Sequence, residues 1–354
     1  MQKFISNGDV IIQEKISQAS RQGIQKVVVT GNYEIMDTIY LPSNMTLVLE
    51  DCHLKMADGT FCNMFRNEAL RNADFDLEKS DKNIRIIGLG RAILDGGTYN
   101  GLSEKNSLKE GMPHVLNNSL LLFCNVENFE IDNIETRNQR YWAQTFYSCR
   151  YGKIRNIHVL SDYMRIDENG QVMSGLKRDL YQQTRVKNSD GIDIRVGCHD
   201  ILIENITGFS EDDTVAVTAL SDTYARNMKW TDGNSIYNIM IKNIQSTDFC
   251  SNVRLLNQGG IKLYNVAIDG VMAQLNKEYT DYQCGAAVKI GDKRLYGSRH
   301  STQEETYNIS VNNVFGVATS VYLAGEMRNC TLTNIFVGEN GKMIENHATI
   351  YNDN

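Results

Sequence analysis

The feature that most constrains this chain is a four-residue pattern, aliphatic–x–Asn–(Ile/Val), which recurs seven times along the sequence. The copies occupy positions 131–134, 154–157, 203–206, 241–244, 263–266, 311–314 and 332–335. Their asparagines are 23, 49, 38, 22, 48 and 21 residues apart. We interpret these intervals as a repeat unit of about 21–24 residues. The intervals of 49 and 48 residues are double steps, each spanning two units, and the interval of 38 residues is one unit lengthened by an insertion. A degenerate copy of the pattern lies at 86–89. A fixed period of this size predicts a solenoid, in which each repeat stacks on the next.

The residues inside each unit indicate which kind of solenoid forms. Segments such as 201–206 alternate apolar and polar positions and are rich in β-branched residues, which is a strand pattern. Helical repeats need longer units with apolar residues at helical spacing, and the frame of leucine-rich repeats is absent. The sequence therefore predicts an all-β chain folded as a single-stranded, right-handed parallel β-helix, with about three short strands in each coil.

The recurring asparagine has a mechanical role in such a fold. Asparagine tolerates the left-handed backbone conformation that a turn between strands requires. Stacked copies can also hydrogen-bond from coil to coil as an amide ladder. We therefore expect the asparagines of the pattern to lie at bends and to form columns along the solenoid.

The amino-terminal segment is the one stretch that we expect to be helical. Residues 8–23 place four apolar residues on one helical face: Ile11, Ile12, Ile16 and Ala19. A solenoid exposes its core at an open end, so we interpret residues 1–30 as an N-terminal cap on a single domain that spans residues 1–354. Four segments interrupt the repeat and are expected to be loops: about 98–117, 163–187, 219–235 and 276–306, the last with a strand-like stretch at 286–290.

Composition excludes several classes of function. A net charge of −7 without a long basic run argues against nucleic acid as a partner. No stretch of 18 apolar residues is present, so no membrane span is expected. The first residues lack the apolar core of a secretory signal, so we expect a cytoplasmic protein. The eight cysteines are scattered without metal-ligand spacing, so we expect free thiols, no metal and no cofactor.

Three aspartates are spaced by one repeat. Asp190 precedes Asp212 by 22 residues and Asp213 by 23, so the three should lie on adjacent coils at the same angular position, with backbones about 4.8 Å apart. Like charges this close repel unless they are partly protonated or paired. Such a group suits general acid–base chemistry on a glycosidic bond. Bound Ca²⁺, or aspartates that only cap turns, would also account for it.

The strands that follow these acids predict a second set of site residues. Asp193, Ala216 and Arg254 share one phase of the alternation, and Lys289 fits the same phase one coil later. If that phase faces outward, Arg254 and Lys289 flank the acids and can bind an anionic group such as the carboxylate of a sugar. The alternative is a pair of solvated surface cations.

These segments resemble a known family. The chain resembles the pectin-lyase-like β-helix superfamily and, within it, glycoside hydrolase family 28, the polygalacturonases. The resemblance rests on 82–90 with the Asp-Gly turn at 94–97, on Asn138 and 142–149, on the Asn-Ser-Asp-Gly-Ile-Asp segment at 188–193, and on the paired aspartates at 212–213. It implies inverting hydrolysis of an oligosaccharide or polysaccharide, with Asp212 as proton donor and Asp190 and Asp213 activating water. It also implies substrate contacts from Asn188, Asp193 and Trp142.

Two departures from the family pattern bear on the substrate. Where the family has Gly-His-Gly, this chain has Phe-Cys-Ser at 249–251, although His300 on a loop can fold toward that place. The family's Arg-Ile-Lys keeps one cation, at 289–291 or 254–256. We therefore expect a divergent glycosidase that acts on oligosaccharides. The alternatives are a lyase or epimerase of uronic-acid sugars, which would need Ca²⁺, and a non-catalytic carbohydrate-binding β-helix.

Overall fold

The computed structural model describes most of the chain. The described residues are 3–60, 62–72, 78–97, 119–139, 142–161, 190–220, 234–275, 285–297 and 299–353. Asn188 and most residues of the four expected loops lie outside these ranges. The strand-like stretch at 286–290 lies inside them and is confirmed as a strand.

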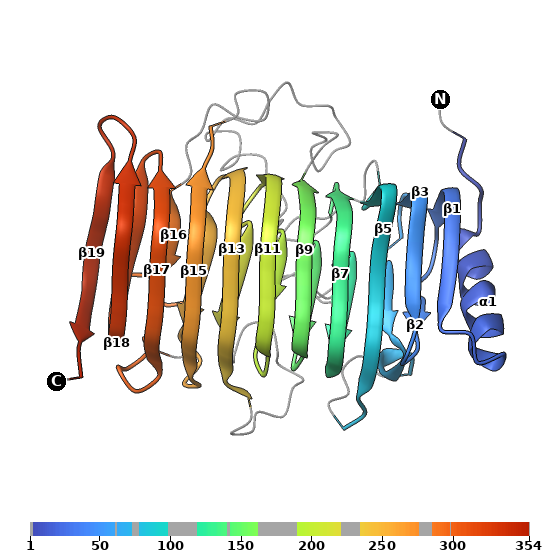
Figure 1. Ribbon diagram of the computed structural model, residues 1–354, viewed down its shortest axis with the longest axis horizontal. Helices are drawn as coiled ribbons and strands as arrows, with labels where there is room; N and C mark the ends of the chain where they lie inside the picture. Colours follow the sequence, from blue (N-terminus) through green and yellow to red (C-terminus); the bar gives the residue numbers. More distant parts are fainter. Residues whose placement is uncertain are drawn as a thin grey trace.

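The N-terminal helix α1 (Gly8–Arg21) covers the first coil, as predicted. Ile12, Ile16 and Ala19 are buried on its inner face and belong to the same apolar core as the strands, with Ile11 partly buried beside them. Figure 1 shows α1 at the end of the solenoid where the chain begins. Burial of each isoleucine contributes about 2 kcal/mol, so this face holds the helix on the first coil. No helix within the described residues is long and apolar enough to cross a membrane.

The remainder of the described chain is a parallel β-helix, as the repeat predicted, with nineteen strands joined in one hydrogen-bonded sheet in which the strands pair in parallel. One series consists of long strands, which lie side by side along the solenoid in Figure 1. They are β1 (Lys26–Ile35), β3 (Thr46–Met56), β5 (Asp81–Asp95), β7 (Val126–Arg137), β9 (Arg150–Leu160), β11 (His199–Ser210), β13 (Ile236–Asp248), β15 (Leu263–Ala273) and β17 (Thr306–Gly316).

A second series of shorter strands forms another face, which we call the short-strand sheet. It consists of β2 (Ile39–Leu41), β4 (Phe65–Asn67), β6 (Leu121–Cys124), β8 (Gln144–Tyr147), β10 (Ile192–Ile194), β12 (Val215–Ala219), β14 (Ser251–Asn257) and β16 (Ala286–Ile290). The long strand β18 (Thr319–Val337) pairs with both β16 and β17, and β19 (Lys342–Tyr351) pairs with β18. A single 3₁₀ turn, η1 (Glu68–Leu70), follows β4 within the described residues.

The core is built of aliphatic columns along the solenoid. In one column Ile131, Ile154 and Ile203 occupy paired positions on successive long strands, and Ile241 and Ile268 continue it. All five are buried. Each coil therefore buries its apolar face against the coils on either side, which is why a repeat of this length is stable only as part of a stack.

The asparagines of the repeat adopt the predicted backbone conformation. All seven have positive φ, between 50° and 60°. The amide of Asn205 donates to Asn156 at 3.0 Å, and that of Asn243 donates to Asn205 at 3.2 Å. The expected amide ladder is confirmed for these coils, and each asparagine both turns the chain and joins two coils.

The repeat pattern places one of its copies, at 263–266, at the wrong position within its coil. Asn265 pairs with a second asparagine column, in which its amide donates to Asn238 at 3.1 Å and accepts from Asn308 at 3.0 Å. The equivalent of Asn243 in that coil is Gly270, with φ of 79°, because Lys242 pairs with Asp269 and Ile244 with Val271. Two columns five residues apart carry the same side chain, so the pattern by itself could not tell them apart.

The two predicted double steps are also wrong. Ile157 pairs directly with Ile206, so the interval of 49 residues is a single coil enlarged between its strands. Likewise β15 pairs directly with β17, and Val266 lies opposite Ile309. Loop-closure entropy grows only slowly with loop length, so a coil tolerates a long insertion where a whole additional coil was expected.

Candidate active site

The short-strand sheet orients the predicted site residues through its alternation. Ile192, Val215 and Val253 lie in the apolar core. The residues that follow them point to the other side of the sheet and are in register: Asp193 pairs with Ala216, and Ala216 with Arg254. Lys289 pairs with Arg254 on the next coil, so the phase that the sequence predicted for these residues is confirmed.

The turn that enters each short strand carries the other acids. The N–H of Gly191 donates to the carbonyl of Asp213 at 3.0 Å, and the N–H of Thr214 donates to that of Ser251 at 3.0 Å. Asp190, Asp213 and Ser251 therefore occupy equivalent positions on three successive coils, which the one-coil spacing predicted for the two aspartates. A Cβ at position 191 would lie 2.5 Å from the Thr214 carbonyl oxygen, which is why a glycine follows Asp190.

Hydrogen bonds join these turns through the acids. The Oδ1 atom of Asp190 accepts from the Asp213 N–H at 3.0 Å, and the Oδ1 atom of Asp213 accepts from the Ser251 hydroxyl. Asp190 is 6% exposed, Asp213 7% and Asp193 0%, whereas Asp212 is half-buried. Asp212 is thus the most accessible carboxyl of the four, which we call the acid cluster.

Burial and mutual repulsion alter the titration of this cluster. Burial raises the pKa of Asp190 well above its ordinary value, and the charges of Asp193, Asp212 and Asp213 raise it further. Burial also raises the pKa of Asp193, to which Asp213 and Asp212 add, although the Arg195 guanidinium acts in the opposite direction. The cluster therefore holds protons at pH values where exposed aspartates are ionised.

Arg195 is a site residue that sequence reasoning missed. Its side chain is buried, with Nη1 3.8 Å from Asp193 Oδ1, and it donates to the Thr218 hydroxyl. The guanidinium lies 4.8 Å from the ring centre of Trp142, which is itself 2% exposed. The sequence feature that could have identified Arg195 is its position two residues after Asp193, because alternate residues of an extended segment point to the same side. The substrate contact expected of Trp142 stays a prediction.

Arg254 and Lys289 share one counter-ion, Asp292, which the sequence also did not reveal. Asp292 Oδ2 lies 2.9 Å from Arg254 Nη2 and 2.6 Å from Lys289 Nζ. Arg254 is 5% exposed and Asp292 5%, whereas the side chain of Lys289 is 19% exposed, so solvent reaches this ion triplet through Lys289. Asp292 follows the β16 strand in a loop whose chain path the repeat did not specify.

Cys250 lies between the acid cluster and the ion triplet. Burial raises the pKa of its thiol well above the ordinary value, and Asp213 and Asp212 raise it further against the opposing charges of Arg254 and Lys289. Among the described residues, Asp212, Asp213 and Cys250 bring one possible ligand atom each to within 4.8 Å of one another. Ca²⁺ requires six to eight oxygen ligands, and a protonated thiol is a poor ligand for any metal, so this set does not suit Ca²⁺.

Two further residues named in the sequence analysis are Asn188 and His300. Asn188 is outside the described residues. The ring of His300 contacts Gln258, whose Nε2 atom is 3.3 Å from His300 Nδ1. Gln258 also accepts from the Tyr296 N–H at 2.5 Å, so it ties the loop after β16 to the β14 coil.

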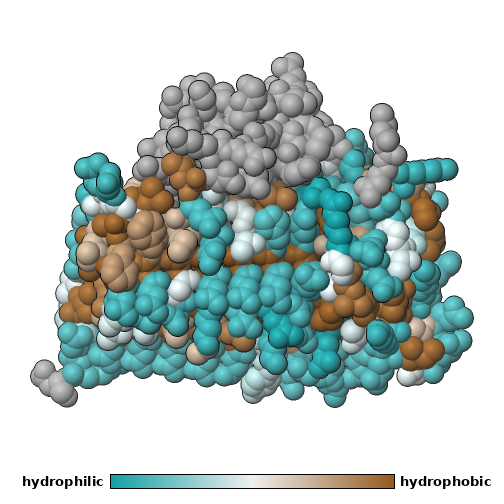
Figure 2. All heavy atoms as spheres, turned by 45° about the horizontal axis from the view of Figure 1, so that its top comes forward, coloured by the Kyte–Doolittle hydropathy of each residue, from teal (hydrophilic) through white to brown (hydrophobic). Residues whose placement is uncertain are grey.

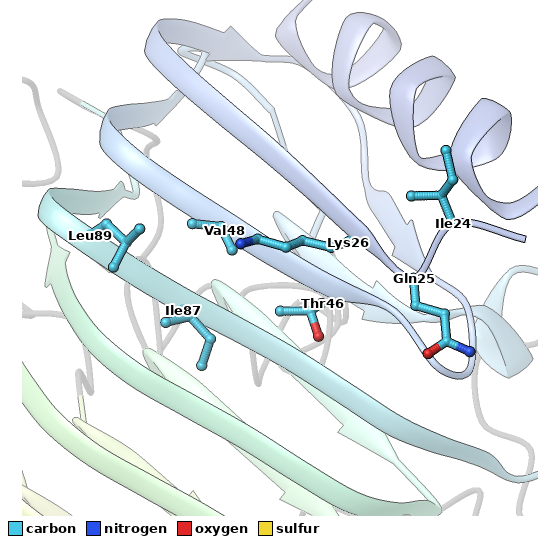
Figure 3. A pocket seen from close by; sticks show the side chains of 7 residues that line it. All are labelled: Ile24, Gln25, Lys26, Thr46, Val48, Ile87 and Leu89. Carbon is cyan, nitrogen blue, oxygen red and sulfur yellow. The ribbon is translucent and has the colours of Figure 1, made fainter.

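A hollow of about 480 Å³ lies on another face, over the first coils. Figure 3 shows it between β1, β3 and β5, with Lys26, Val48 and Leu89 among its lining residues. No acid lines it, and its strands precede the acid cluster by several coils. On the face shown in Figure 2, hydrophilic residues dominate the middle of the solenoid, and hydrophobic residues gather toward its two ends.

Comparison with known proteins places the fold. No protein-family model and no curated protein matches this sequence. Among solved structures, a polygalacturonase from Erwinia carotovora is similar with a TM-score of 0.60 and 14% identity, over 99% of this chain and 95% of that chain. An exopolygalacturonase from Thermotoga maritima has a TM-score of 0.54 and 14% identity, over 96% of this chain and 87% of that one.

A third similar structure is a tailspike of the E. coli bacteriophage HK620, with a TM-score of 0.58 and 14% identity over 94% of this chain and 60% of the tailspike. The architecture shared with all three is the right-handed parallel β-helix. The parallel β-helix fold that the resemblance implied is thereby confirmed.

Proposed function

We propose that this protein is a glycoside hydrolase that cleaves O-glycosidic bonds with the acid cluster. The observation that carries the proposal is the convergence of Asp190, Asp193, Asp212 and Asp213 from two adjacent coils at one largely buried place. Glycosidic hydrolysis needs one protonated carboxyl for the leaving oxygen and one ionised carboxylate for water. A cluster in which burial and like charges raise the pKa of Asp190 and Asp193 supplies both states side by side.

The exposure and contacts of each acid suggest its role. Asp212, the most accessible, protonates the glycosidic oxygen, as the family resemblance implies. Asp213 is held by the Ser251 hydroxyl, so its carboxylate is fixed in position to accept a proton from the attacking water. Asp190, whose raised pKa favours its protonated form, accepts from the Asp213 N–H and holds that turn in place. The polygalacturonases to which this chain is similar carry that activity in their names, and their likeness supports a sugar polymer as substrate.

The stereochemistry of the reaction gives a separate test. We propose inversion, which needs room for water between the base and the anomeric carbon and a typical carboxyl separation of about 6.5–9.5 Å. The nearest oxygens of Asp212 and Asp213 lie within 4.8 Å of each other, which is shorter than this typical separation, so the anomer of the product tests the assignment of the two acids directly. Proton NMR of the first product formed identifies its anomer, and a retained anomer would reassign one acid as a nucleophile.

The deciding experiment is product release from a panel of oligosaccharides by the wild type and by Asp212→Asn, each with and without EDTA. We expect new reducing ends from the wild type, unaffected by EDTA and reduced about 10²–10⁴-fold in the variant, because general acid catalysis contributes that much. Unsaturated, ultraviolet-absorbing products that disappear with EDTA would instead establish a lyase. Binding without any product would establish a carbohydrate-binding protein.

A further inference from the structure

The ion triplet of Arg254, Lys289 and Asp292 faces the proposed substrate site from the coils next to the acid cluster. Arg254 and Lys289 lie on the same outward row as Asp193, on the second and third coils after it. Two cations so placed would ordinarily attract an anionic sugar. Here the same oxygen of Asp292 accepts from both.

The position of Asp292 is held from several sides. Its second oxygen accepts from the Arg294 N–H at 2.9 Å, so the backbone fixes the carboxylate under the two cations. Hydrogen bonds from Lys289 and from Arg294, with the charges of Lys289 and Arg254, lower the pKa of Asp292 despite its burial. Asp292 therefore carries its negative charge throughout the neutral range and is a permanent partner of both cations.

The surrounding charge acts in the same direction. Arg254 interacts electrostatically with Asp213 as well as with Asp292, so the two cations face more than one carboxylate. The Cys250 thiol is affected by Asp212 and Asp213 and also by Arg254 and Lys289, so the two groups of charges are within electrostatic reach of each other. An incoming carboxylate would have to displace Asp292 from the cations or stand beside it, and either costs free energy.

We propose that Asp292 is a specificity-determining residue that restricts the substrate to uncharged sugars at the position beside Arg254 and Lys289. This inference rests on the proposed glycosidase function. The aromatic rings at this position fit the same substrate class: Tyr296, 44% exposed, has the Arg254 guanidinium 5.7 Å from its ring centre, and Lys289 Nζ lies 5.3 Å from that of Tyr322. Such rings pack against the C–H face of a neutral sugar without any ionic contact.

The test compares neutral oligosaccharides with their uronate counterparts, namely galacto- with galacturono-oligosaccharides and gluco- with glucurono-oligosaccharides. For the wild type we expect kcat/KM to favour the neutral member of a hydrolysed pair by at least about tenfold. Asp292→Asn should lower this preference by about tenfold or more, because it frees two cations for a carboxylate. Lys289→Gln, which removes a cation, should move the preference in the opposite direction. The matched control is Glu130→Gln on β7, an acid that is ion-paired to Arg155 at 2.7 Å on another face and should leave the preference unchanged.

The outcomes separate this inference from the function on which it rests. A wild type that hydrolyses the uronate member better refutes the role of Asp292 while leaving a glycosidase. If Asp292→Asn is folded by circular dichroism and its preference between the neutral and uronate members is unchanged, the role of Asp292 is likewise refuted. If that variant does not fold, Lys289→Gln decides, and an unchanged preference refutes the inference. If the wild type hydrolyses neither member of any pair, the glycosidase proposal itself fails, and the inference falls with it.

Discussion

Replacing Asp212 by asparagine should lower activity and raise stability together. The nearest oxygens of Asp212 and Asp213 lie within 4.8 Å, and at pH values where both are ionised two unit charges at that distance repel by about 3.5 kcal/mol at an effective dielectric constant of 20. Asp212 is half-buried, so solvent screening reduces the gain in stability to about 1–2 kcal/mol. An unfolding entropy of about 2.1 cal/mol/K per residue over 354 residues converts this to a rise in Tm of about 1.5–3 °C.

The same substitution should change how stability depends on pH. The charge of Asp212 contributes to the raised pKa of Asp190. A carboxyl with a higher pKa in the folded chain than in the unfolded chain binds its proton more tightly when folded. Its contribution to stability is therefore complete below the unfolded pKa, near 3.8, and is lost as the pH rises through the folded value. We expect wild-type stability to decline from about pH 4 upward, and Asp212→Asn to make that decline shallower.

Thermal unfolding followed by circular dichroism between pH 4 and pH 8, with kcat measured on the same samples, checks both parts. Glu14→Gln on the exposed side of α1 removes one negative charge away from the cluster and should change neither quantity. A variant that is less stable than the wild type across the whole range from pH 4 to pH 8 would mean that Asp212 is held by favourable contacts rather than strained by repulsion. Unchanged kcat would remove Asp212 from the proposed mechanism.

Three further outcomes are expected. Asn205→Ala should lower the free energy of unfolding by about 2–4 kcal/mol, because alanine is strained at φ of 60° and two hydrogen bonds of the amide ladder are lost. Asn205→Gly loses only the two hydrogen bonds and should lower the free energy of unfolding by about 1–2 kcal/mol. Equal losses for the two variants in urea unfolding would contradict the argument from backbone strain. Ser251→Ala should reduce kcat about 10–100-fold with little change in KM, because the Ser251 hydroxyl positions Asp213. The control Ser320→Ala, at a buried serine of β18, should leave kcat unchanged. A change in Ser251→Ala that is confined to KM would contradict this role. EDTA should leave kcat unchanged, because the residues grouped around Cys250 do not suit Ca²⁺. Activity that is lost on chelation and restored by Ca²⁺ would show that the site does bind Ca²⁺.

The fold and the alignment of the acids were predictable because both depend on the repeat. A β-helix coil contributes one residue to each column, so a spacing of 22 or 23 residues predicts neighbours directly. The placement of Asp190 beside Asp213, and of Asp193, Arg254 and Lys289 in one outward row, follows from such counting. Counting succeeded even across the 38-residue step from Ala216 to Arg254, because strand alternation re-established the phase after the insertion.

Counting residues along the repeat gave the wrong arrangement where two different arrangements of the coils have the same spacing. Asn265 and Asn243 lie in different columns, and only hydrogen bonding between coils distinguishes them. The enlarged coil between Asn156 and Asn205 has the length of two coils, and sequence length alone does not say whether the added residues stack or loop out.

The sequence by itself determined the solenoid, its capping helix and the angular position of the acids, because local alternation and left-handed asparagines repeat with every coil. Only the tertiary structure decided which charges meet. Arg195 reaches Asp193, and Asp292 reaches both Arg254 and Lys289, through side chains and loops that no period describes. The physical reason is that a repeat specifies where backbones stack, whereas the pairing of charges depends on the chain path between strands and on which groups are buried together.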